Sequence, residues 1–102
     1  MASNPKAEAC LVATAVHLSL MVVADPNLRM WIGILEEILP DCEGCPDELV
    51  PVRETAAALV GARTTTKRDN ALVWLRDETR RYYQRAAAYR HEAWKLAKGG
   101  RG

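Results

Sequence analysis

The sequence predicts an all-α fold: a small helical bundle of three shorter helices and one long C-terminal helix, completed by dimerisation. Three observations predict it. Apolar residues recur at three- and four-residue steps, prolines and glycines gather between these runs, and no strand signature is present. With 102 residues, 49% of them hydrophobic and 26% charged, the chain has the size and composition of one globular domain. We expect this domain to span residues 1–98, with a flexible tail at 99–102.

The first helix is predicted over residues 5–24. Asn4 offers a side-chain acceptor to free backbone amides, and Pro5 suits the first turn. Asp25 and Pro26 then end the helix. The positions expected to face inward are Ala9, Val12, Ala13, Val16, Leu20 and Val23, with Leu11, Leu18 and Val22 widening the stripe. A helix that is apolar over most of its circumference belongs in the middle of a bundle.

Two shorter helices are predicted next. The first begins with Pro26 in its first turn and ends at residue 39, and the second covers residues 51–62. The first carries its apolar residues at the helical repeat and stops at Pro40. Its inward positions are Leu28, Trp31, Ile32, Leu35, Ile38 and Leu39, and those of the second are Val52, Ala56, Leu59 and Val60. Between them, residues 40–51 hold three prolines and a glycine, which predicts a structured loop with a short helical turn at 46–50.

The last helix is predicted from Lys67 to Lys98, a segment without glycine or proline. Thr66 and Asp69 resemble a capping box at its start. A heptad seam, in which seam positions are spaced 3-4-3-4, runs through Leu72, Leu75, Thr79, Tyr82, Ala86, Tyr89, Ala93 and Leu96. At 1.5 Å per residue this helix is about 48 Å long and outreaches the shorter helices by about 15–20 Å.

The seam and the projecting part of the long helix together predict a partner surface. An antiparallel homodimer would let each long helix complete the seam of the other, and another protein would satisfy the same geometry. The expected interface residues are Leu75, Tyr82, Ala86, Tyr89, Ala93 and Leu96, with Trp94 as an exposed anchor on a different face. The alternative is that the seam is only the core face of a long bundle helix and binds no partner.

Charge is divided unevenly along the chain although the net charge is only +1. Residues 1–66 carry four basic and nine acidic residues, whereas residues 67–102 carry ten basic and four acidic residues. This asymmetry raises the alternative of a helical RNA- or DNA-binding protein. Its contacts would be Arg76, Arg80, Arg81, Arg85 and Arg90, interleaved with the aromatic rings of Tyr83 and Trp94. The same arginines would also select acidic protein partners.

Chemistry-bearing residues are few. Cys42 and Cys45 form a Cys-x-x-Cys pair, which supplies half of a tetrahedral zinc site. The remaining ligands would have to come from Cys10, His17 or His91, which lie on different predicted helices. A structural loop without metal is therefore favoured, with zinc binding or a reversible disulfide as the alternatives. His17, inside an apolar helix, is expected to be a hydrogen-bonded core residue, and His91 is expected to be exposed.

The sequence shows no Ser-His-Asp spacing, glycine-rich phosphate loop or convergent acid pair. It therefore predicts a protein without enzymatic activity or cofactor. The apolar residues 11–24 are interrupted by Thr14, His17 and Ser19 and follow no basic cluster, which argues against a signal peptide. Three cysteines, an odd number, favour a reducing, cytoplasmic compartment. No stretch of about 18 charge-free apolar residues is present, so no membrane association is expected. The function expected from these observations is that of a small adaptor, assembly factor or regulator.

Overall fold

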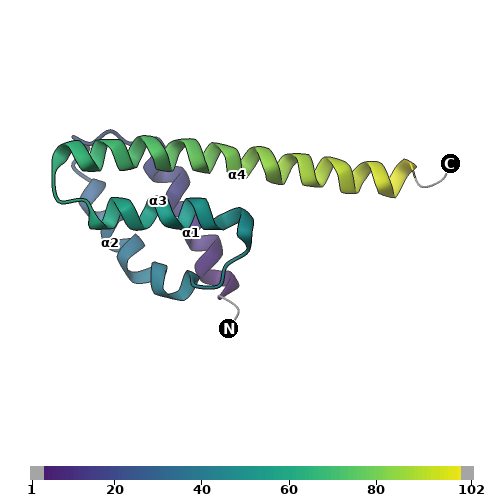
Figure 1. Ribbon diagram of the computed structural model, residues 1–102, viewed down its shortest axis with the longest axis horizontal. Helices are drawn as coiled ribbons and strands as arrows, with labels where there is room; N and C mark the ends of the chain where they lie inside the picture. The colour runs from purple at the N-terminus through teal and green to yellow at the C-terminus, as the bar shows by residue number, and fades with distance from the viewer. Residues whose placement is uncertain (1–3, 100–102) are drawn as a thin grey trace.

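The computed structural model describes residues 4–99, apart from the side chains at 89, 90, 92, 93 and 97–99. Within this range every regular element is helical, which confirms the predicted all-α class. The elements are α1 (Pro5–Ser19), α2 (Leu28–Ile38), the 3₁₀ turns η1 (Leu39–Cys42) and η2 (Asp47–Leu49), α3 (Val50–Gly61) and α4 (Thr65–Gly99) (Figure 1).

The long helix α4 lies across the shorter helices and continues beyond them (Figure 1). Its first part packs against α3 and α1, while α2 packs against α1 and α3. The resulting molecule is elongated, with extents of 57 × 29 × 18 Å and a radius of gyration of 15.6 Å. A compact domain of this length has a radius of gyration of about 13 Å. The excess reflects the part of α4 that projects from the bundle.

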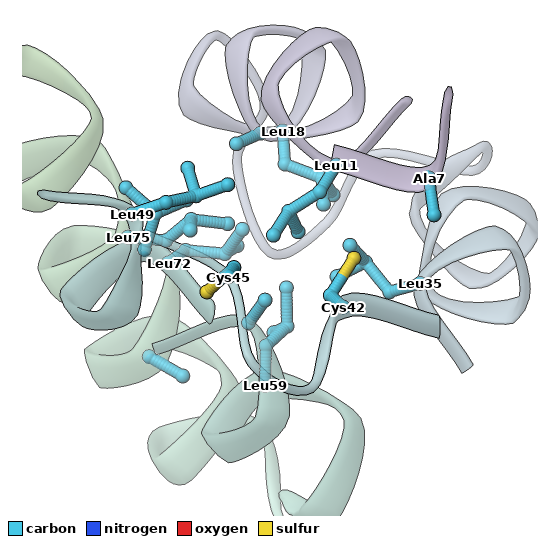
Figure 2. Close-up of a cluster of buried hydrophobic side chains, with 14 of the residues drawn as sticks. Ala7, Leu11, Leu18, Leu35, Cys42, Cys45, Leu49, Leu59, Leu72 and Leu75 are labelled. Atoms are coloured by element: carbon cyan, nitrogen blue, oxygen red, sulfur yellow. The ribbon is translucent and has the colours of Figure 1, made fainter. Parts of the chain in front are cut away.

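Leucine side chains from all four helices form the core (Figure 2). The largest fully buried side chains are Leu11, Leu18, Leu35, Leu59, Leu72, Leu75, Val52 and Cys42. Among the described side chains, Thr14 and Thr79 are the buried polar ones, and the Thr79 hydroxyl donates to the Leu75 carbonyl at 2.6 Å. An aliphatic core of this kind allows the helices to approach closely without aromatic rings between them.

The sequence-based description of α1 is wrong in two respects. The helix ends at Ser19 and not at residue 24, and most of the predicted inward positions lie outside the core, although Leu11 and Leu18 are buried as predicted. The buried positions are Ala7, Leu11, Thr14, Ala15 and Leu18, whereas Ala9 and Ala13 are exposed and Val12 and Val16 are half-buried. The inward face follows the two leucines, because they have more apolar surface to remove from water than alanine or valine.

The early end of α1 has local and tertiary causes. The Ser19 hydroxyl donates to the Val16 carbonyl at 2.6 Å, and the Arg76 side chain of α4 binds the chain directly after the helix. Arg76 donates from Nε to the Ser19 carbonyl at 2.8 Å and from Nη2 to the Met21 carbonyl at 3.3 Å. These bonds satisfy carbonyls that a continued helix would have used, so the chain leaves the helix there.

The helix starts test two capping predictions. The Asn4 side chain accepts from the Lys6 amide at 2.9 Å, which confirms the N-cap of α1. The predicted capping box at Thr66 and Asp69 is wrong, because α4 begins two residues earlier than predicted, at Thr65. Thr64 takes the capping role instead, its hydroxyl accepting from the Lys67 amide at 3.1 Å.

The remaining boundaries follow the prediction closely. Helices α2 and α3 end within one residue of the expected positions, and η2 occupies the short turn expected at 46–50. Pro40 does not stop the chain abruptly but sits at the second position of η1, where its missing N–H group costs no hydrogen bond.

Candidate partner-binding surface

The predicted seam of α4 changes from buried to exposed along the helix. Leu72, Leu75 and Thr79 are buried in the core. Further on, Tyr82 and Ala86 are half-buried, and Leu96 is 74% exposed. The side chains of Tyr89 and Ala93, predicted to lie between them, are outside the described residues. The first half of the seam is therefore a core face. The second half is covered by progressively fewer residues of the same chain.

We call residues 80–99 of α4 the distal segment. Thr79 is the last buried residue before it, and Tyr82 and Ala86 are its only half-buried side chains among those described. Its other described side chains are all exposed. Twenty helical residues extend about 30 Å, so α4 projects from the bundle by several turns (Figure 1). The projection is longer than the overhang of about 15–20 Å expected from the sequence, because the shorter helices cover α4 only as far as Thr79.

A groove of about 940 Å³ lies where the distal segment leaves the bundle. It is bordered by the first half of α1, by η2 with the preceding Pro46, and by α4. The lining residues are Pro5, Glu8, Ala9, Val12, Pro46, Glu48, Leu49, Tyr82, Arg85, Ala86 and Ala88. Eight of these eleven residues are apolar, so the groove is an apolar channel with three charged side chains.

Hydrogen bonds attach two of the elements that border the groove to the rest of the bundle. The Asn4 amide donates to the Asp41 carbonyl at 3.2 Å, which fixes the start of α1 on η1. Arg53 of α3 donates to the Cys42 carbonyl at 3.4 Å and to the Cys45 sulfur at 3.8 Å. The loop between η1 and η2 is thereby attached to α3, and it places η2 beside α4.

The cysteines of this loop are core residues. Cys42 is fully buried, Cys45 is 6% exposed, and both are free thiols (Figure 2). Their sulfur atoms point in different directions (Figure 2). Burial raises the pKa of the Cys42 thiol, and Cys45 and Glu8 raise it further. Burial therefore favours the neutral thiol of Cys42, which is a weaker nucleophile than the thiolate.

The residues considered as further zinc ligands do not assemble around the loop. Among the described residues, no group of three or more His, Cys, Asp or Glu side chains is placed to hold a metal ion. His17 is exposed and stacks on Trp31 with ring centroids 4.5 Å apart, so the prediction of a core histidine is wrong. His91 is exposed, as predicted, and its ring stacks near Trp94 at 6.2 Å.

The predicted arginine stripe is divided among several roles. Arg76 is half-buried and binds the backbone after α1, and Arg81 pairs with Glu78 at 2.9 Å. Arg85 lines the groove and Arg80 is exposed, whereas the side chain of Arg90 lies outside the described residues. The stripe does not form a single uniform cationic surface, because its first member is used inside the fold.

The exposed aromatic rings lie on more than one face of α4. Trp74 and Trp94 are each 55% exposed, and Tyr83 is 44% exposed. At 100° per residue, Trp94 lies about 120° around the helix from Tyr82. It is therefore not part of the face that Tyr82, Ala86 and Leu96 share.

Comparison of the chain with protein families, curated proteins and solved structures found no match. Within residues 4–99 no helix combines the length and apolarity needed to cross a bilayer. The distal segment and the groove at its base are the features of the molecule that indicate a function.

Sequence reasoning missed the groove, although the spacing of its residues carries a signal. Pro5, Glu8, Ala9 and Val12 fall at i, i+3, i+4 and i+7, which is one face of a helix. This face lies to the side of the leucine face that enters the core. Ala9 and Val12 belong to the inward stripe that the sequence predicts. In the structure they line the surface groove, beside the leucine face of α1.

Proposed function

We propose that the protein is a non-enzymatic adaptor or assembly factor that homodimerises through the distal segment of α4. The observation that carries the proposal is the projection of this segment with an apolar face on one side. Tyr82, Ala86 and Leu96 share that face, and Leu96 is 74% exposed. Exposed apolar faces of this length mark surfaces that bind a partner.

A second copy of the chain is the partner that the charges favour. The distal segment carries six basic residues and one acidic residue, whereas residues 1–66 have a net charge of −5. In an antiparallel pair of distal segments, the end of each basic helix reaches the acidic bundle of the other chain. Small residues alternate with large ones along the seam, which permits close helix packing.

The nucleic-acid alternative has weaker support from the side chains. Arg76 donates both of its hydrogen bonds to backbone carbonyls, and Arg81 has an acidic neighbour in Glu78. Two of the five predicted contacts are therefore engaged within the chain. Arg80 and the exposed Tyr83 remain available to an acidic protein surface.

Sedimentation equilibrium tests the proposal. We expect the wild-type chain to reach twice the 11.3 kDa mass of one chain at micromolar concentrations, with or without added RNA or DNA. Leu96→Glu is expected to weaken dimerisation by about tenfold or more, because it places a charge in an apolar contact. A wild-type mass that stays at one chain, even at high concentration, would contradict dimerisation.

The matched control is Gln84→Glu. Gln84 is exposed on the same segment but about 200° around the helix from Tyr82, and the substitution adds the same charge. We expect its dimerisation constant to stay within about twofold of wild type. Equal losses in both variants would show that charge alone, and not the apolar face, controls the association.

A further inference from the structure

The groove at the base of the distal segment has a defined occupant. We infer that it receives the C-terminal end of α4, residues 92–99, from the second chain of the dimer. This inference rests on the proposed homodimer and adds a site to it: the partner helix not only pairs with α4 but also contacts α1 and η2. Three observations support it, namely the register of the helices, the size of the groove and the charges around it.

The register follows from where the bundle ends and where α4 ends. The part of α4 that is free to pair begins after Thr79 and ends at Gly99. An antiparallel pair that uses this whole length is centred on residue 89. In that register Tyr82 of one chain lies opposite Leu96 of the other. Because Tyr82 and Ala86 form one wall of the groove, the partner helix end arrives at the groove itself.

The size and polarity of the groove fit a helix end. An α-helix with its side chains is 10–12 Å across and rises 5.4 Å per turn, so about two turns occupy roughly 1,000 Å³. The groove measures about 940 Å³ and its walls include Ala9, Val12 and Leu49. Leu96, 74% exposed in one chain, would be covered there by apolar side chains. A chain cannot fill its own groove, because Leu96 lies about 20 Å along a straight helix from Tyr82.

The charges around the groove are complementary to this occupant. Glu8 and Glu48 line it, the exposed Asp47 lies beside Glu48 on η2, and Arg85 is the one basic residue among the lining residues. Residues 92–99 carry two basic residues and one acidic residue. The excess of acid at the groove would attract the excess of base at the end of the partner helix, and this attraction favours the direction in which the helix enters.

The first experiment measures dimerisation of Ala9→Arg against Ala58→Arg by sedimentation equilibrium. Both alanines are exposed on helices, but only Ala9 lines the groove, whereas Ala58 lies on α3 away from it. The arginine at position 9 fills the groove and repels the lysines of the partner. We expect a dissociation constant raised about tenfold or more for Ala9→Arg and by less than about twofold for Ala58→Arg.

The second experiment locates the helix end directly. p-Benzoylphenylalanine replaces Leu96 in the full chain, and photocrosslinked peptides are identified in a mixture of isotope-labelled and unlabelled chains. Crosslinks between chains from position 96 to residues 5–12 or 46–49 are the expected result. A dimer that crosslinks only along α4, with Ala9→Arg equal to wild type, overturns the groove inference and leaves the proposed dimer intact. A wild-type chain that stays monomeric overturns both.

Discussion

Polar side chains in this protein act mainly at the ends of helices. Asn4 caps α1, Thr64 caps α4, and Arg76 closes the C-terminal end of α1 from a different helix. Backbone groups at helix ends have no partner within the helix, so a buried or half-buried end is stable only when side chains supply the bonds. Among these three residues Arg76 alone connects segments far apart in the sequence.

Arg76→Ala is expected to destabilise the fold. It removes the two hydrogen bonds from the guanidinium to the Ser19 and Met21 carbonyls, and bonds to charged groups contribute about 1.5–3 kcal/mol each. Because Arg76 is partly exposed, we expect a total loss near the lower end of that range. Urea denaturation followed by circular dichroism measures it. Arg80→Ala, an exposed control on the same helix, should change the free energy of unfolding by about 0.5 kcal/mol or less.

The Cys42 thiol predicts a pH dependence of stability. Its pKa is raised above the ordinary value of 9.0 by burial, so the folded chain holds the thiol proton more tightly than the unfolded chain. The contribution to stability is complete below pH 9.0 and is lost as the pH rises through the folded-state pKa. Cys42→Ala should lower stability at neutral pH through lost packing, but its stability should fall less steeply above pH 9.0. Parallel pH profiles for the two proteins would contradict this assignment.

At the scale of the element, α4 consists of two halves with different tasks. Residues up to Thr79 pack into the bundle. The distal segment continues the same heptad pattern outside the bundle, where we propose that a partner binds. The same heptad pattern runs through both halves, so the pattern alone does not distinguish a core face from a partner face. What distinguishes them is the length of the shorter helices, which cover only the first half of α4.

Truncating leucines along α4 should separate the two tasks. Leu75 is fully buried, and Leu75→Ala is expected to reduce the free energy of unfolding by about 2–5 kcal/mol. Leu96 is exposed in the single chain, so Leu96→Ala should leave unfolding at low protein concentration within about 0.5 kcal/mol of wild type while weakening dimerisation. Denaturation and sedimentation on the same samples measure both. Equal destabilisation by the two variants would argue against a division of α4.

The sequence predicts elements in this protein better than faces. The four helices, the loop with its short turn and the length of α4 follow from prolines, glycines and apolar repeats, which are local signals. The core face of α1 does not, because alanine and valine occur on nearly all of its sides and only packing against α2 and α4 selects the leucine face. The end of α1 depends on Arg76, a residue 57 positions away from Ser19. The groove needs three separate elements, so no single segment of sequence reveals it.

At the scale of the whole molecule, the uneven charge is the dominant feature. A bundle with excess acid carries a helix with excess base, and in one chain that helix projects away from the bundle (Figure 1). The attraction between the two parts can therefore act only weakly within a chain, since most of the distal segment lies well beyond the ~10 Å screening length of about 0.1 M salt. In the proposed dimer, the end of the basic helix of one chain would come close to the acidic bundle of the other.

Salt should consequently weaken the dimer. Raising the salt concentration from about 0.05 M to about 0.5 M screens the attraction between the basic helix and the acidic bundle, and we expect the dissociation constant to rise several-fold. Sedimentation equilibrium across this range measures the change. Glu48→Gln, which removes a carboxylate at the groove, should reduce the salt dependence. An association that strengthens with salt would instead indicate a purely apolar interface.

The absence of any glycine or proline between Lys67 and Lys98 would also fix how the two molecules of the proposed dimer are oriented. Each residue added to a continuous helix rotates everything beyond it by about 100° and shifts it by about 1.5 Å. Two alanines inserted after Ala87 would turn Leu96 from about 40° to about 160° around the helix from Tyr82, whereas seven inserted residues would shift it by only about 20°. In the proposed dimer, α4 thus sets both the spacing and the rotation between one bundle and the other.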